Sequence, residues 1–106
     1  MNSDKIVKAF NSNELQIQGV ISIYGSYFGK PGDTISCVKG ISSKENVLII
    51  DIGDRKISIK SPKGIDYNHC SIDINECESI KVNDQEYSFK ENEKAFNLYN
   101  WSADSN

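Results

Sequence analysis

The side chains that most often act in catalysis are scarce in this chain. It holds one histidine, His69, and three cysteines, Cys37, Cys70 and Cys77. A Ser-His-Asp or Cys-His arrangement would have to use His69, and its neighbour Cys70 points to the opposite side of any strand that contains both. Only Cys37 or Cys77 could meet His69 through the fold. We expect the cysteines to pack as small apolar side chains instead.

Metal and phosphate motifs are also missing from the sequence. Six residues separate Cys70 from Cys77, which is not the spacing of a zinc site, and no C-x-x-C motif occurs. The segment GSYFGKPG at 25–32 has three glycines, but Pro31 and the aromatic pair before it would obstruct a phosphate-binding nest. Neither common glycine-rich nucleotide motif is present. The sequence therefore predicts no metal, no cofactor and no enzymatic activity.

Two features could instead form a protein-binding surface, and the first is acidic. Within fourteen positions the chain places five carboxylates with only Lys81 to offset them, and these are Asp73, Glu76, Glu78, Asp84 and Glu86. If residues 80–89 form a hairpin, we expect the five to cluster at one end of a sheet. Such a patch suits a basic partner, for example a nuclease whose surface holds phosphate. The alternative is a solvated stretch that keeps the protein soluble.

The second feature is the aromatic stretch YGSYFGKPGD at 24–33. Its composition predicts a loop, with glycines for unusual φ values and Pro31 for stiffness. In that loop Tyr27 and Phe28 would either fold back over the open end of the core or project as anchors for a partner. Aromatic anchors are the residue type favoured at binding hot spots.

Charge and apolar patterning limit the class of partner and the location. The 106 residues carry a net charge of −3, which disfavours direct binding to nucleic acid or to an anionic membrane. Residues 1–63 hold nine basic and six acidic side chains, whereas residues 64–106 hold three and nine. The N-terminus lacks the apolar core of a secretory signal, and VLII at 47–50 is too short to span a bilayer. We expect a cytoplasmic protein with no membrane partner.

The sequence pattern predicts that the elements which position these residues are strands. Fifteen isoleucines and five valines recur mostly in alternation, which suits a pleated sheet. We expect strands over 14–24, 34–42, 47–52, 55–60, 71–74, 80–82, 86–90 and 96–101. Gly53-Asp54 predicts a type II′ hairpin, in which Asp51 caps the turn or pairs with Arg55 or Lys56.

The remaining segments are expected to be less regular. The composition predicts a loop at 61–69 and a hairpin turn at 83–85. It predicts one helical turn at 91–95 and a tail at 102–106. The segment 1–13 fits either an N-terminal helix or an edge strand. Together the pattern predicts one all-β domain over 1–106, an antiparallel sandwich or small barrel of about seven or eight short strands.

Three segments carry a resemblance to known proteins. GVISIYGSYFGKPGD at 19–33, VLIIDIGDRKISIKSPKG at 47–64 and NLYNW at 97–101 are similar to a group of small bacterial proteins. That group has an F-G-[RK]-P loop after the first strand, a central hairpin that ends in a proline turn, and an aromatic last strand. Here the matching residues are 28–31, 57–62 and 97–101, and the resemblance covers residues 19–101.

The chain also resembles immunity proteins of bacterial polymorphic-toxin and contact-dependent growth inhibition systems in size, acidity and lack of catalytic residues. This resemblance implies a cytoplasmic protein that binds one cognate toxin domain, expected to be an RNase, and blocks its active site. The candidate toxin-binding residues are Tyr27, Phe28, Asp73, Glu76, Glu78, Asp84 and Glu86. The alternative is a small nucleic-acid- or ligand-binding β module, using the lysines at 30, 39, 56, 60 and 63 near Tyr24.

Overall fold

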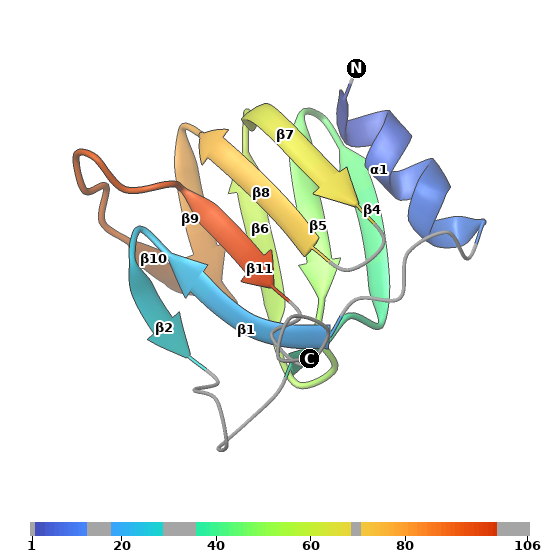
Figure 1. Ribbon diagram of the computed structural model, residues 1–106, viewed down its shortest axis with the longest axis horizontal. Helices are drawn as coiled ribbons and strands as arrows, with labels where there is room; N and C mark the ends of the chain where they lie inside the picture. The colour runs from blue at the N-terminus through green and yellow to red at the C-terminus, as the bar shows by residue number, and fades with distance from the viewer. Residues whose placement is uncertain (1, 13–17, 29–35, 69–70, 100–106) are drawn as a thin grey trace.

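Alternating apolar residues build two antiparallel sheets that face each other in a computed structural model of the chain (Figure 1). The structure describes residues 2–12, 18–28, 36–68 and 71–99. The first sheet has the order β2-β1-β11-β8-β7, with β3 also paired to β1. Its strands are β1 (Gln18–Ile23), β2 (Ser26–Phe28), β3 (Ser36–Cys37), β7 (Lys63–Asn68), β8 (Ser71–Glu76) and β11 (Phe96–Tyr99).

The second sheet has the order β10-β9-β6-β5-β4. Its strands are β4 (Gly40–Lys44), β5 (Val47–Asp51), β6 (Lys56–Lys60), β9 (Ser79–Val82) and β10 (Gln85–Tyr87). The predicted all-β class is confirmed. Within the described residues the two sheets stay separate and do not close into a barrel, which decides between the two predicted architectures in favour of the sandwich.

The core lies between the sheets and consists mainly of isoleucine. On β5 and β6 the inward residues Ile50 and Ile57 face each other across the ladder, and both are fully buried. The first sheet contributes fully buried side chains such as Ile72 and Phe96 from the opposite layer. Each such side chain contributes about 1.5–3 kcal/mol through removal of apolar surface from water. Period-two patterning therefore fixes which face of each strand turns inward.

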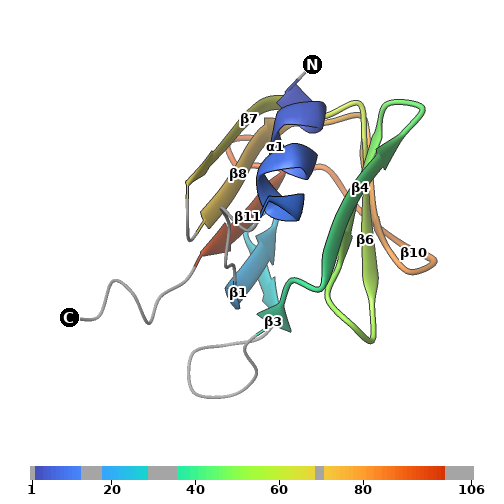
Figure 2. The ribbon, with the colours of Figure 1, turned by 90° about the vertical axis from the view of Figure 1, so that its right-hand side faces the viewer.

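The N-terminal segment forms a helix, α1 (Asn2–Asn11), which decides between the two expectations for residues 1–13. The helix covers the open side of the sandwich beside β4 and β7 (Figure 2). Ile6 and Ala9, three residues apart, are buried against the core, and Val7 and Phe10 pack partly against it. Helical spacing thus gives one apolar face, and that face closes the space between the sheets.

The hairpin turns follow the sequence closely. Gly53 has φ 99°, as the first position of a type II′ turn requires, and its N–H donates to Asp51 Oδ1 at 2.8 Å. Asp51 therefore caps the turn as predicted. The turn after β9 has two residues, Asn83 and Asp84, and not the predicted three, because Val82 pairs directly with Gln85. Asn83 takes the left-handed φ of 54° that asparagine tolerates.

Several elements differ from the sequence-based expectation. Residues 63–68 form the edge strand β7 and not a loop, and residues 91–95 form turns and bends and no helix. The described residues contain eleven strands, more than the seven or eight expected, because short strands such as β2 and β3 flank longer ones. Tyr27 and Phe28 lie in β2 and not in a loop. Residues 13–17, 29–35, 69–70 and 100–106 lie outside the described residues.

Phe96→Ala should lower the free energy of unfolding by about 3–5 kcal/mol, because it leaves a cavity at a fully buried site. Phe89→Ala removes the same ring from a side chain that is 73% exposed and should cost less than about 1.5 kcal/mol. Urea denaturation of both variants measures the difference. Equal losses would contradict this placement of the core.

Candidate protein-binding pocket

A pocket lies where the segment 88–95, between β10 and β11, passes the β1–β2 turn and the end of β8. We call it the loop pocket; its volume is about 590 Å³. A volume of this size is typical of sites that receive a ligand or a side chain. Its lining residues are Tyr24, Asn75, Glu76, Cys77, Phe89, Glu91, Asn92, Glu93 and Lys94.

Backbone hydrogen bonds fix the end of this segment. The N–H of Tyr24 donates to the carbonyl oxygen of Ala95 at 3.2 Å, and the N–H of Ala95 donates to the carbonyl oxygen of Asn75, also at 3.2 Å. Ala95 itself is fully buried. The β1–β2 turn, the 88–95 segment and β8 are therefore held together before any side chain contributes.

The β1–β2 turn has an unusual residue at its first central position. Ile23 pairs with Ser26, so Tyr24 and Gly25 form a two-residue turn with φ values of 49° and 80°. A left-handed conformation is ordinary for Gly25 but uncommon for a bulky side chain such as Tyr24. The burial of the tyrosine ring, which is 4% exposed, compensates for this conformation.

The inner wall of the loop pocket is neutral. The hydroxyl of Tyr24 lies 3.3 Å from Cys77 Sγ, within hydrogen-bonding distance. Burial raises the pKa of Tyr24 to about 12, and the contact with Cys77 adds to the shift. Burial also raises the pKa of the Cys77 thiol, although the bond from Tyr24 opposes this. Both groups are protonated at neutral pH, so the wall offers a hydroxyl and a thiol and no thiolate nucleophile.

Phe89 stands at the mouth of the loop pocket. It is 73% exposed and is the exposed large hydrophobic side chain among the described residues. Its ring makes a T-shaped contact with Tyr24, with centroids 5.6 Å apart and ring planes at 82°. A single exposed apolar residue is common on protein surfaces. Here, however, the ring is oriented by a buried aromatic partner and borders a cavity, which is the arrangement of a binding anchor.

The charged lining of the loop pocket is mainly acidic. Glu76, Glu91 and Glu93 line it with a single cation, Lys94, whose Nζ lies 3.1 Å from Asp73 Oδ2. The Glu93 carboxyl group lies directly over Gly25, so closely that a Cβ at that glycine would stand 2.8 Å from it. The absence of a side chain at Gly25 therefore makes room for one of the acidic groups.

The five carboxylates predicted as one patch are distributed over both sheets. Asp73 lies on β8, where it accepts hydrogen bonds from Lys94 and from Asn97, and Asp66 lies opposite it in the strand register. Lys94 thus offsets two like charges that face each other across strands. Glu76 is the last residue of β8, Glu78 lies in the β8–β9 connection, and Asp84 and Glu86 lie in the β9–β10 hairpin.

Lysines accompany three of those four carboxylates, and the first pair is Lys63 opposite Glu76 in the register of β7 and β8. Glu78 Oε2 is 2.9 Å from Lys60 Nζ, and Glu86 lies opposite Lys81 in the register of β9 and β10. Asp84 occupies the turn between these strands, away from the loop pocket. Of the five predicted carboxylates only Glu76 lines the loop pocket. Lysine neighbours therefore reduce the acidity of the predicted patch.

The aromatic pair predicted as anchors is placed only by its backbone. Tyr27 and Phe28 belong to β2, opposite Ser22 and Ile21 of β1. The loop residues that follow, 29–35, lie outside the described residues, as do His69 and Cys70. Tyr27 and Phe28 therefore lie in a strand beside β1 and not in the predicted loop. The reason is that Gly25 allows the chain to reverse direction before it reaches Tyr27.

Sequence reasoning missed the residues that surround Phe89. The segment EYSFK was expected to be a strand, in which only Glu86 was a candidate binding residue, and ENEKA was expected to be a helical turn that held no candidate. One signal was present: an aromatic residue is followed within five positions by Glu91 and Glu93. The contact of this segment with Tyr24 and Cys77 joins residues far apart in sequence, and no local pattern indicates it.

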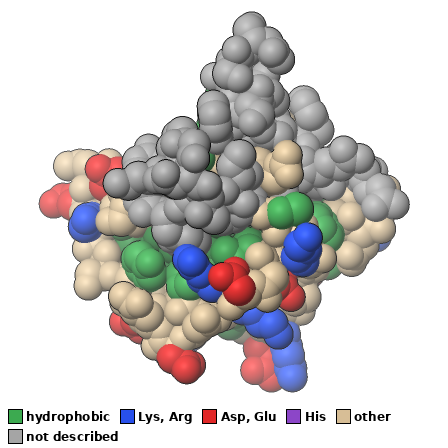
Figure 3. All heavy atoms as spheres, turned by 90° about the horizontal axis from the view of Figure 1, so that it is seen from below, with side chains coloured by type: hydrophobic (Ala, Val, Ile, Leu, Met, Phe, Trp, Pro, Cys, Tyr) green, Lys and Arg blue, Asp and Glu red, His purple; other side chains and the backbone are tan. Residues whose placement is uncertain are grey.

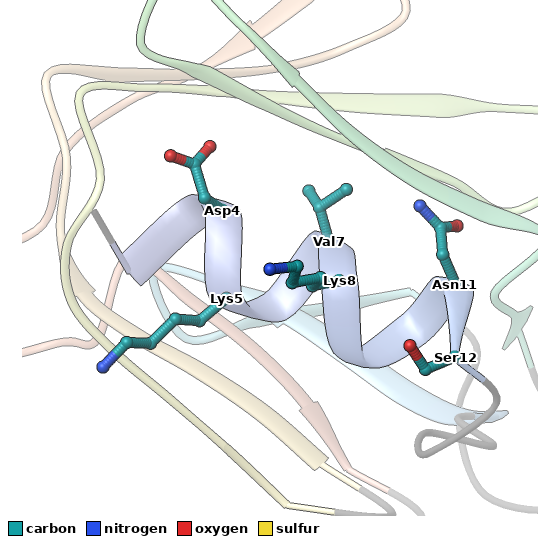
Figure 4. A pocket seen from close by; sticks show the side chains of 6 residues that line it. All are labelled: Asp4, Lys5, Val7, Lys8, Asn11 and Ser12. Carbon is teal, nitrogen blue, oxygen red and sulfur yellow. The ribbon is translucent and has the colours of Figure 1, made fainter.

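A smaller cavity of about 370 Å³ lies along α1. Asp4, Val7 and Asn11 project from the helix on the side of the green strands (Figure 4). Ser43 Oγ of β4 donates to Asp4 Oδ1 at 3.4 Å, which helps to hold the helix on the sheet. The cavity carries charges of both signs and no large exposed apolar side chain from the described residues. We regard it as a consequence of helix docking.

Seen from below, described acidic and basic side chains are interspersed around apolar ones, so charge of one sign does not cover that face (Figure 3). Among the described residues no group of three or more His, Cys, Asp or Glu could hold a metal ion, and no helix is long and apolar enough to cross a membrane. No protein-family model, curated protein or solved structure matches the chain.

Gly25→Ala should destabilise the fold by about 1–3 kcal/mol, because alanine is strained at a φ of 80° and its Cβ would displace Glu93. Gly40→Ala is the matched control, since its nearest neighbour, Asp51 Cβ, lies at an ordinary 3.9 Å. It should leave the free energy of unfolding within about 1 kcal/mol of the parent. Urea denaturation distinguishes the two, and a Gly25→Ala variant as stable as the parent would disprove the left-handed backbone conformation of Gly25.

The buried phenol of Tyr24 should cause the free energy of unfolding to fall in alkaline solution. In the unfolded chain its phenol ionises near 10.0, whereas burial raises the folded pKa to about 12. A raised pKa favours the protonated folded state, so this stabilisation is complete below pH 10 and is lost as the pH rises towards 12. Two pKa units correspond to at most about 3 kcal/mol.

The measurement is the free energy of unfolding at pH 9 and at pH 11 for the parent and for Tyr24→Phe. The parent should lose about 1 kcal/mol more than Tyr24→Phe over this interval. Tyr87→Phe is the control and should lose as much as the parent. The assignment is wrong if Tyr24→Phe and the parent show the same pH dependence.

Proposed function

We propose that this chain is an immunity protein, a non-enzymatic inhibitor that binds a cognate toxin domain and occludes its active site. The observation that carries the proposal is the exposed ring of Phe89, oriented by Tyr24 at the mouth of the loop pocket. Binding energy at protein interfaces concentrates in a few aromatic or arginine anchors beside pockets. The site has the form of such an anchor.

The charge of the chain supports a basic partner. Residues 64–106, which supply every charged residue of the loop pocket, hold nine acidic and three basic side chains. A nuclease that binds phosphate carries a basic surface, and opposite charges steer the two proteins together. The proposal therefore names a nuclease, an RNase in particular, as the toxin class.

Inhibition of this kind needs no catalytic group. A rigid sandwich that covers about 800 Å² of its partner excludes substrate by steric occlusion alone. The isoleucine core and the backbone bonds at Ala95 provide the rigidity, so little conformational entropy is lost when the anchor binds. Phe89 would supply the apolar contact and the carboxylates around it the orientation.

The experiment is co-expression of this chain with RNase toxin domains, followed by a growth assay and sizing of the complex. We expect rescued growth and a tight 1:1 complex. Phe89→Ser should weaken the complex by about 30-fold or more, as for a typical hot spot. Val47→Ser, on the outer side of β5, is the matched control for loss of an apolar side chain and should leave affinity unchanged.

Two results would count against the proposal in different ways. Absence of both rescue and complex would overturn the immunity function, and retention on immobilised RNA at low salt would then favour the nucleic-acid-binding alternative. A complex that Phe89→Ser and Val47→Ser weaken equally would place the interface elsewhere. Both variants should first show a parent-like urea midpoint, so that unfolding is not mistaken for lost binding.

A further inference from the structure

We infer that the loop pocket receives the guanidinium group of an arginine presented by a basic protein partner. The inference rests on the proposed function, because the arginine belongs to the protein that is inhibited. It goes further by naming the chemical group that enters the pocket and the side chains that hold it.

The exposed ring of Phe89 is suited to contact with a cation. A cation is attracted to the negative face of an aromatic ring, and the planar guanidinium of arginine also stacks on it. The T-shaped contact with Tyr24 orients Phe89 and still leaves the side chain 73% exposed. A ring that is both fixed and accessible at the mouth of a cavity is suited to this contact.

Three carboxylates in the lining of the loop pocket give it negative charge. Glu76, Glu91 and Glu93 line the same cavity as Phe89. In the part of the chain that the structure describes, no ion pair engages any of the three, although Lys63 lies opposite Glu76 in the strand register. The cation in the lining, Lys94, is bound to Asp73. The pocket therefore carries negative charge that an incoming cation would compensate.

The arrangement of the described carboxylates does not suit a metal ion. The three carboxylates do not converge into a group that could hold one. A cavity of about 590 Å³ with carboxylates spaced around it and an aromatic ring at the mouth fits a larger cation. A guanidinium has five N–H donors in a planar fork, so it can reach separate carboxylates at once, whereas the ammonium of lysine is a compact point charge.

The test is an NMR titration of the intact chain with a capped glycyl-arginyl-glycine peptide. Its citrulline counterpart has the same shape without the charge. We expect the arginine peptide to shift the backbone amides of Tyr24, Gly25 and residues 89–95, and to bind at least tenfold more tightly than the citrulline peptide. Equal binding of the two peptides, or shifts confined to other parts of the molecule, would overturn the inference.

A pair of triple variants separates a local site from overall charge. The first triple variant should weaken arginine binding at least tenfold, and it combines Glu76→Gln, Glu91→Gln and Glu93→Gln. A control triple variant, Asp4→Asn with Glu45→Gln and Asp54→Asn, removes the same number of charges at exposed positions away from the loop pocket and should leave arginine binding unchanged. If both triple variants bound the arginine peptide equally weakly, the net charge of the chain and not the loop pocket would account for binding, and the inference would be overturned. A lysine peptide that binds as tightly as the arginine peptide would overturn the assignment of a guanidinium.

This titration uses the chain without any toxin, so its outcome is independent of the co-expression assay. Growth rescue with no arginine binding would overturn the assignment of the pocket and leave the immunity function in place. Arginine binding in the pocket without growth rescue would support the pocket and remove the immunity function.

Discussion

Contact between the isoleucine-rich inner faces of two sheets is the interaction on which the rest of the structure depends. Fully buried residues such as Ile50 and Ile57 in one layer face Ile72 and Phe96 in the other. Two flat layers leave their sides open, and apolar side chains there would meet water. The helix α1 covers one side through Ile6 and Ala9, so the need to close the core determines the position of the only helix in the described residues.

The same constraint positions the loop pocket. The chain must cross from β10 in the second sheet to β11 in the first, and this crossing is the 88–95 segment. Its end is held because Ala95 bonds to Tyr24 and to Asn75 through the backbone, and because Ala95 is buried. The segment therefore has a fixed base and an exposed middle. A surface residue on such a segment can be both accessible and well oriented, as Phe89 is.

Much of the fold follows from local sequence signals. Alternation predicted the sheets, and Gly53-Asp54 predicted a hairpin that the positive φ of Gly53 confirms. β7 was missed because its composition, with a proline just before it and Gly64 within it, resembles a loop, and only pairing with β8 makes it a strand. The loop pocket was missed for a related reason. Tyr24 and Cys77 are 53 residues apart, and their contact depends on the topology of both sheets.

The distribution of acidic residues shows why a local cluster in sequence differs from a site in space. Asp73 and Glu78 are engaged by lysines that the fold brings beside them, so their charge is largely compensated. In the sequence Glu91 and Glu93 do not form an acidic cluster, because a lysine stands on each side of them. In the structure, however, Lys94 is bound to Asp73, so it does not compensate the charge of the pocket carboxylates. The ion pair of Lys94 with Asp73 therefore has two effects. It relieves the repulsion between Asp66 and Asp73, which lie opposite each other in β7 and β8, and it leaves the three glutamates of the loop pocket without an ion pair to the lysine beside them.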